Sequence, residues 1–499
     1  MNPAHPSSQT GFTRRRFLGE ANCAALSSIP ILNMLLNLKL ANTVAAQTAQ
    51  PAPSDRKTLV CLFLNGGMDS FNMLVPRDGR HAAYATSRGN LALPLTPQPV
   101  PPMEPVIPLN QEAGGDGLLY GIHPSCIGLA ELFNGLGGDT AKRRLSFVAN
   151  VGTLIQPATK SQYLAESVPL PRALFSHSDQ IDQWQTSVPQ GMSQLSGWGG
   201  RAADVLHTNA NSGATSMSIS MSGNNLFGVG NSTEQFVVTP GGALTFTKAQ
   251  PGQPLTNPLN VKNTAQRSLI EQHYGNLMHE AFAKLTKGSL DLQEYFQTQF
   301  NGFNESRITT PFPSNNFLAT TLRSVAKTIA LRPELGLKRQ TIFISVGGWD
   351  HHGELLTTQA GMLSSVSAAL LAYQKALEEL GLQNEVITFT CSDFGRTLRS
   401  NGRGTDHAWG GNAIVMGGAV QGGRIAGTFP DLALDSANDV GHGGRLLPTT
   451  SVDQFFAEML RWFGVSAANM SYVLPNIANF NNPASPTLPV GFLKPGTWS

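Results

Sequence analysis

Short unbroken runs of apolar residues constrain the fold of this chain more than any other feature of its sequence. The first run, 58–64, is bounded by the glycine-rich stretch Asn65-Gly66-Gly67. Comparable runs recur at 145–151, 341–346, 386–391 and 413–416. Strands buried on both faces of a parallel sheet are continuously apolar, whereas strands with one face in water alternate. The runs therefore predict a buried, mostly parallel central sheet.

Amphipathic helical patterns lie between several of these runs. They cover 265–300 with a break near Gly288, 317–331, 355–380 with Gly381 as a C-cap, and 451–463. Glycine just beyond the last periodic residue is a common helix end. Strands that alternate with helices are typical of a sheet covered by helices on both faces. The predicted fold class is therefore α/β, with a doubly wound sheet.

Three regions depart from this alternation. Residues 90–119 are rich in proline and glycine, which predicts a long surface loop. In the region 212–256, two short apolar stretches, 236–238 and 244–246, flank a Pro-Gly-Gly turn and predict a β-hairpin. We interpret 212–256 as a β-rich insertion that covers the functional site. The segment 469–499 is rich in proline and asparagine, and we expect an irregular tail on the surface.

Charge and cysteine content exclude two classes of protein. The chain has 499 residues, and its 34 Lys and Arg and 32 Asp and Glu leave a net charge of +2. Nucleic-acid-binding domains carry strongly basic patches, so we expect no nucleic-acid partner. After the N-terminal segment, the cysteines are Cys61, Cys126 and Cys391. An odd number of cysteines cannot form a complete disulfide framework.

The first 46 residues have the organisation of an export signal. Thr13-Arg14-Arg15-Arg16-Phe17-Leu18 is followed by an apolar stretch, 24–38, and by Val44-Ala45-Ala46. Charged, apolar and small residues in this order are typical of a secretory signal, and the paired arginines resemble the twin-arginine signal. The apolar stretch is shorter than the roughly 20 residues of a membrane-spanning helix.

These features predict a periplasmic or otherwise exported protein with no stable transmembrane segment. The expected partner in export is the twin-arginine translocation machinery. The expected organisation is a signal at 1–46, a linker at 47–57 and one domain at 58–499.

Acidic residues and histidines gather just after the predicted strands, where ligands bind in open α/β sheets. They are, in chain order, Asp69, Asp350, His352, Asp393, Asp406 and His407. Converging carboxylates repel one another unless a cation or a proton neutralises them. A mixed Asp and His set is typical of zinc, manganese or iron. We therefore predict a divalent metal site, with zinc or manganese favoured and calcium or magnesium as alternatives.

Three of these motifs also have a purely structural explanation, whereas Asp350-His351-His352 is harder to explain in this way. Asp69 could cap a helix after the Gly-Gly turn. Asp393 could form an ion pair with Arg396, and Asp406 and His407 could form a solvated turn. Charged residues make up only 13% of the chain, so their concentration at strand ends favours the metal site.

A serine at a predicted helix start is the candidate nucleophile. Ser176 precedes a helical pattern that continues to Trp184. A hydroxyl at a helix N-terminus lies where backbone N–H groups favour an anion. Ser176 fits an alkoxide nucleophile beside a phosphate, and it equally fits a plain N-cap. Ser70, Ser178 and water are the alternative nucleophiles.

Taken in order, the motifs resemble those of an exported bacterial family, the domain of unknown function 1501, which is grouped with alkaline-phosphatase-like and sulfatase-like proteins. The resemblance covers almost all of the chain after the export signal. It rests on the twin-arginine start and on 64–69, Ser176-His177 with Gln180, 348–352, 392–397, 404–411, 447–454 and 462–464.

The resemblance implies an alkaline-phosphatase-like α/β/α sandwich with a mostly parallel central sheet. The metal ligands and nucleophile that it implies are Asp69, Asp350, His352, Asp393, His407 and, as nucleophile, Ser176. Phe394 stands where metal-dependent phosphatases have a histidine, so one second-metal ligand is absent or is replaced by Asp406. The stretch 167–171 has proline where sulfatases have arginine, which argues against a strict sulfatase.

The favoured function is an exported metal-dependent hydrolase of phosphate or sulfate esters that acts on a small anionic ester. The six Asp and His side chains would hold the metal and Ser176 would attack. Arg396 would clamp the developing oxyanion. The alternative is a non-catalytic exported binding or envelope-assembly protein with a degenerate active site, which Phe394 favours.

Export is expected to depend on the paired arginines. Replacing both Arg14 and Arg15 with lysine keeps the charge but removes the two guanidinium groups, so the precursor should accumulate in the cytoplasm. Fractionation followed by immunoblotting measures the distribution. An unchanged periplasmic yield would rule out the twin-arginine interpretation.

Overall fold

The computed structural model describes residues 52–99, 102–113, 115–191, 194–213, 215–243 and 258–498. All described residues belong to one compact unit, Thr48–Ser499. The predicted export signal at 1–46 and the first part of the predicted linker lie outside the described residues.

A large central sheet organises the described residues. Its strand order is β10-β9-β8-β11-β1-β12-β13-β7-β14, and β15 also pairs with β7. The bounds are β1 Lys57–Leu64, β7 Leu145–Gly152, β8 Ser218–Ser220, β9 Phe236–Thr239, β10 Gly242–Ala243, β11 Arg339–Val346, β12 Val386–Ser392, β13 Gly411–Met416, β14 Ile425–Ala426 and β15 Thr450–Ser451. Most neighbouring strands are parallel, whereas β13 is antiparallel to both β12 and β7.

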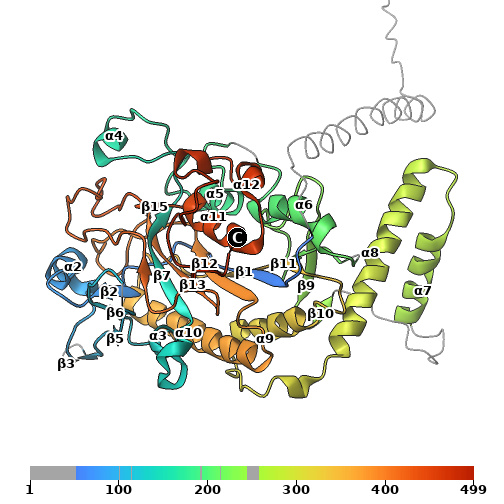
Figure 1. Ribbon diagram of the computed structural model, residues 1–499, viewed down its shortest axis with the longest axis horizontal. Helices are drawn as coiled ribbons and strands as arrows, with labels where there is room; N and C mark the ends of the chain where they lie inside the picture. The colour runs from blue at the N-terminus through green and yellow to red at the C-terminus, as the bar shows by residue number, and fades with distance from the viewer. Residues whose placement is uncertain are drawn as a thin grey trace, which may run out of the picture. The chain divides into compact units, whose positions relative to one another are not determined.

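Helices cover both faces of this sheet (Figure 1). On one face α10 packs against α3 and α9, and on the other α6 packs against α5 and α12, with α11 beside α12. The bounds are α2 His81–Arg88, α3 Ile127–Asn134, α4 Lys160–Leu164, α5 His177–Thr186, α6 Trp198–Ala210, α7 Pro258–Glu271, α8 Leu277–Asn301, α9 Phe317–Ala330, α10 Leu355–Glu379, α11 Val452–Phe463 and α12 Ala467–Val473. The predicted α/β class with a mostly parallel sheet is confirmed.

The helix predicted at 265–300 breaks at a different place. Gly288 lies inside the continuous helix α8, and the break between α7 and α8 precedes Asn276. The Asn276 side chain accepts hydrogen bonds from the backbone N–H groups of Met278 and His279. An N-cap of this kind starts a new helix, whereas a single glycine inside a helix costs only about 1 kcal/mol.

The region 212–256 extends the central sheet. β8 pairs in parallel with β11, β9 pairs in parallel with β8, and β9 and β10 form an antiparallel hairpin. The predicted hairpin arm at 244–246 lies outside the described residues. These strands form one edge of the central sheet, and the interpretation of 212–256 as a cover over the functional site stays a prediction.

The predicted surface loop at 90–119 contains short strands. Two small antiparallel sheets have the orders β2-β6-β5 and β3-β4. Their bounds are β2 Leu74–Pro76, β3 Gln98–Pro99, β4 Pro102–Met103, β5 Ile107–Leu109 and β6 Tyr120–Ile122. Short 3-10 helices occur at Gly89–Leu91, Leu136–Gly138, Thr140–Lys142, Glu305–Arg307 and Ile477–Asn479.

Within the described ranges, α10 is the one helix that is long and apolar enough to cross a membrane by length and composition alone. It packs against α3 and α9, and 44% of its most apolar window is buried inside the protein. Apolar helices in the cores of α/β domains have the same composition, so α10 is described as a core helix.

The C-terminal segment is anchored to the domain by a buried carboxylate. Glu458 in α11 accepts four backbone hydrogen bonds: from Val490 at 2.9 Å, Gly491 at 2.7 Å, Phe492 at 2.6 Å and Leu493 at 2.9 Å. Phe492 and Leu493 are buried in the main core. The segment 469–499 is therefore not a tail that lies wholly on the surface.

Glu458→Gln is expected to loosen this anchor. The amide replaces one acceptor oxygen with an NH₂ group that faces backbone N–H groups. Hydrogen bonds to a charged group each contribute about 1.5–3 kcal/mol, so the free energy of unfolding should fall by about 2–3 kcal/mol. Urea denaturation measures the loss, with the exposed Glu104→Gln as the matched control. Equal stability of the two variants would contradict this role.

Candidate metal centre

The candidate site lies where β1, β11 and β12 end. The three strands are parallel neighbours, with Leu64 opposite both Val346 and Ser392. Gly66 lets the loops after β1 and β11 approach closely. Its φ is +126°, and a Cβ atom there would lie 2.6 Å from the backbone nitrogen of Asp350. Loops that are far apart in the sequence therefore meet at one edge of the sheet.

The loop between β12 and β13 folds back on itself and reaches the same edge. Arg396 and His407 form an isolated antiparallel bridge within it. Gly404 lies against the loop after β11, and a Cβ atom at Gly404 would lie 2.4 Å from the carbonyl oxygen of His351. The glycine at this position allows the close backbone contact that places His407 near the end of β11.

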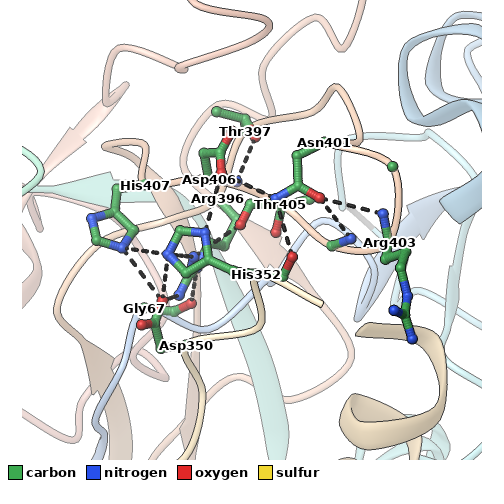
Figure 2. A network of polar contacts seen from close by, with 12 residues as sticks. Gly67, Asp350, His352, Arg396, Thr397, Asn401, Arg403, Thr405, Asp406 and His407 are labelled. Atoms are coloured by element: carbon green, nitrogen blue, oxygen red, sulfur yellow. Dashed lines mark hydrogen bonds and ion pairs between the residues drawn. The ribbon is translucent and has the colours of Figure 1, made fainter. Parts of the chain in front are cut away.

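Asp350 is the centre of the resulting side-chain cluster (Figure 2). Its Oδ1 atom lies 3.0 Å from His352 Nε2 and 3.3 Å from His407 Nε2. Its Oδ2 atom lies 3.5 Å from Nε2 of His177, which comes from the start of α5. The ligand atoms of His177, Asp350 and His407 all lie within 4.8 Å of one another.

Each of the three imidazoles is held through its Nδ1 atom. The Nδ1–H of His177 donates to Asp393 Oδ2 at 2.7 Å, and that of His352 donates to Asp406 Oδ1 at 3.1 Å. The Nδ1–H of His407 donates to the carbonyl oxygen of Phe175 at 2.8 Å. A carboxylate or carbonyl can only accept, so these bonds place the hydrogen on Nδ1. The Nε2 atom of each ring then faces Asp350, which is how metal-binding histidines are usually oriented.

Arg396 supplies a buried positive charge beside the cluster. Its side chain donates to the carbonyl oxygens of Gly67 at 2.7 Å, Thr405 at 3.0 Å and Gly66 at 2.6 Å. It also forms an ion pair with Asp350. Because these groups take up its donors, Arg396 serves as a fixed charge and a link between loops. In this arrangement Arg396 has no free N–H group for the direct contact with an oxyanion that the sequence analysis predicts.

The surroundings set the protonation states of the cluster. Burial acts to raise the pKa of Asp350, but the hydrogen bond and charge of Arg396 outweigh it and hold this pKa below its usual value. Burial lowers the pKa of His407, the charge of Arg396 adds to this effect, and the bond to Phe175 opposes it. An ionised carboxylate beside a neutral imidazole is the state in which both groups bind a metal.

Two predicted ligands orient imidazoles instead of facing the centre. Asp393 is fully buried, and its two oxygens bond to His177 and to the backbone N–H of Gly66. Asp406 bonds to His352 and to the side-chain amide of Asn401. In this geometry they hold side chains that could contact a metal, and their own role as metal ligands stays a prediction.

Asp69 is committed to a different partner. Its Oδ2 atom lies 2.6 Å from Arg88 Nη2, and both side chains are fully buried. The backbone N–H of Asn72 and the hydroxyl of Thr405 donate to the same carboxylate. This geometry does not support Asp69 as a metal ligand. The apolar run before Asp69 correctly predicts its place at the strand end but not its pairing with α2.

Ser176 occupies the N-cap position of α5, as the sequence predicts. Its hydroxyl donates to Asp179 Oδ2 at 2.6 Å and lies 3.3 Å from the hydroxyl of Ser178. The alternative Ser70 is buried, and its hydroxyl accepts from the backbone N–H of Asn412 at 2.7 Å. His177, the residue after Ser176, belongs to the cluster but is not among the ligands predicted from the sequence, although it stands in a motif that carries the family resemblance.

Phe394 packs against two imidazoles of the cluster. Its ring centroid lies 4.8 Å from that of His177 and 4.5 Å from that of His407. The family resemblance predicts a histidine at this position. This chain instead has the Phe394 ring, which forms an apolar wall beside the two imidazoles. The wall restricts the rotation of both rings and excludes a ligand from this side.

Fold and site together define an α/β protein with a histidine–carboxylate cluster at the carboxyl edge of a mostly parallel sheet. The chain belongs to the family described as "Protein of unknown function (DUF1501)", whose model matches residues 56–474.

Similarity to other proteins is remote. No curated protein matches the sequence significantly. The structure titled "Crystal structure of Ps i-CgsB" shares 12% identity and a TM-score of 0.31, over 86% of this chain and 78% of that chain. The soluble domain of lipooligosaccharide phosphoethanolamine transferase A from Neisseria meningitidis shares 10% identity and a TM-score of 0.24, over 85% of this chain and 90% of that chain. At these TM-scores neither protein defines the function of this chain.

Proposed function

We propose that this protein is an exported, metal-dependent hydrolase of phosphate or sulfate esters with a small anionic substrate. The observation that carries the proposal is the convergence of three imidazole Nε2 atoms on the carboxylate of Asp350. His177, Asp350, His352 and His407 would hold a divalent metal. Nitrogen donors with one carboxylate favour zinc or manganese over calcium or magnesium.

The spacing of two imidazoles supports a bound cation. The Nε2 atoms of His352 and His407 are 2.9 Å apart. Because both Nδ1 atoms already donate, two Nε2 atoms at this distance need a proton or a metal ion between them. Burial lowers the pKa of His407 and so disfavours the proton. A metal ion bound by both Nε2 atoms would satisfy the contact.

The chain's own residues have distinct roles in this proposal. A divalent metal would supply Lewis-acid polarisation of a phosphoryl or sulfuryl oxygen. Asp393 and Asp406 orient the imidazoles of His177 and His352, and such carboxylate–histidine pairs raise ligand basicity. Ser176 would attack the ester, with Asp179 within hydrogen-bond distance to accept its proton.

A non-catalytic exported binding or envelope-assembly protein is the second candidate. The ion pair between Arg396 and Asp350 favours it, because this pair already neutralises the central carboxylate without a metal. Phe394 points the same way, since its ring fills the side where a further ligand would stand. In either candidate, export by the twin-arginine machinery remains part of the proposal.

Removing two proposed ligands should abolish metal binding. Asp350→Asn combined with His352→Ala takes away the central carboxylate and one Nε2 donor. Elemental analysis of the full chain, after equilibration with zinc or manganese, should find stoichiometric metal only in the wild type. A metal at 100 times its Kd stabilises the folded state by about 2.7 kcal/mol, so a chelator should lower the Tm of the wild type but not of the variant.

The matched control is His279→Ala with Asp291→Asn, which removes the same side-chain types from exposed positions on α8. This variant should keep both the metal and the response to chelator. If the wild-type protein takes up no metal and a chelator leaves its Tm unchanged, the hydrolase proposal would be overturned and the binding protein favoured.

The nucleophile is tested by Ser176→Ala. Loss of the attacking oxygen should reduce turnover of aryl phosphate or aryl sulfate esters by roughly 100-fold or more, with metal content and melting unchanged. Ser178→Ala, at the adjacent exposed hydroxyl, is the control and should retain activity. Undiminished turnover in Ser176→Ala would shift the role to Ser70, Ser178 or water.

A further inference from the structure

Arg445 is held next to the histidine cluster by two contacts. Its Nε–H donates to the backbone carbonyl of His407 at 2.9 Å. Its guanidinium carbon lies 3.9 Å from the centroid of the Phe175 ring, within the range of a cation–π contact. A bond along the guanidinium plane and a stack on its face together fix both the position and the orientation of the group.

Both anchors of Arg445 belong to the site. His407 Nδ1 donates to the carbonyl oxygen of Phe175, so the two anchors are also bonded to each other. Phe175 directly precedes Ser176 and has a positive φ of +75°. A bulky residue in this backbone region is costly and persists only where surrounding contacts hold it. The stacking of Arg445 is one of these contacts.

The outer end of Arg445 has no protein partner. Among the described residues, no carboxylate lies within ion-pair distance of it, and its Nη–H groups donate to no protein acceptor. Neither Nη atom is among the buried polar atoms that lack partners, so both reach solvent. The side chain is half-buried and therefore partly desolvated. A held, partly desolvated guanidinium with free donors is a binding group for an anion.

Arg396 offers the contrast. Its donors go to Gly66, Gly67, Thr405 and Asp350, and its side chain is 1% exposed. It cannot bond to a ligand without breaking these contacts. Compared with Arg396, Arg445 has donors to offer.

We propose that Arg445 binds the tetrahedral oxyanion group of the substrate, a phosphate or sulfate, through its two Nη atoms. This inference deepens the proposed function and rests on it for the identity of the reaction, but the anion site itself is defined by Arg445, Phe175 and His407. Guanidinium donors match paired oxygens of phosphate or sulfate, whereas an ammonium group offers only a point charge.

The test is the affinity of the full chain for inorganic phosphate and inorganic sulfate, measured by calorimetry. Arg445→Gln should weaken binding of either anion at least ten-fold. Arg445→Lys keeps the charge but loses the paired donors, so its affinity should fall between those of the wild type and Arg445→Gln. The matched control is Arg307→Gln, because Arg307 is also stacked on a phenylalanine, Phe303, but lies in the Glu305–Arg307 helix.

Each result decides the inference. Undiminished phosphate and sulfate affinity in a folded Arg445→Gln or Arg445→Lys would overturn it, as would an equal loss in Arg307→Gln. A wild-type chain that binds neither anion would also overturn it. Thermal melting identifies a variant that has failed to fold, and Arg445→Lys then decides the question because it preserves the charge.

Metal content, determined on the same samples, separates this inference from the proposed function. Anion binding that depends on Arg445 in a chain without metal would end the hydrolase proposal and leave the anion site standing. If the chain holds metal but Arg445→Gln binds the anions as tightly as the wild type, the anion site would be ruled out and the hydrolase proposal would stand.

Discussion

One buried guanidinium, that of Arg396, joins the loops that follow three strands of the sheet. It donates to the carbonyls of Gly66 and Gly67 after β1 and of Thr405 after β12, and it contacts Asp350 after β11. Each backbone carbonyl left unpaired in this buried setting would cost about 1–3 kcal/mol. The relative positions of the loops, and with them the histidine cluster, therefore depend on this one side chain.

The same cation sets the electrostatics of the site. It keeps Asp350 ionised and adds to the burial that keeps His407 neutral. Both effects leave lone pairs facing the centre of the cluster. The pair between Asp69 and Arg88 performs a comparable linking role one layer deeper, where it ties the loop after β1 to α2. Removing one member of such a buried pair is strongly destabilising, because the remaining charge has no partner.

Sequence reasoning predicted the sheet and part of the site for a physical reason. Continuous apolar runs identify strands that are buried on both faces, and the residues after parallel strands must share an edge. That logic places Asp350, His352 and His407 together. It cannot assign partners, because a hydrogen bond depends on side chains that are distant in sequence. Arg88, which pairs with Asp69, and His177, which pairs with Asp393, lie outside the motifs that follow the strands.

A similar limit explains why two arginines with opposite roles look alike in the sequence. Both are arginines in loops that contain glycine, and Arg396 lies within the motif 392–397 that follows a strand. They differ in how many of their N–H groups donate to the protein itself. Nearly all of those on Arg396 do so, whereas on Arg445 only Nε–H does. A group that organises a site must have its bonds satisfied internally, and a group that binds a ligand must keep some unsatisfied. The number of its N–H groups that the protein occupies therefore decides whether an arginine holds the loops together or can bind a ligand. This number is set only when the loops come together in the folded chain.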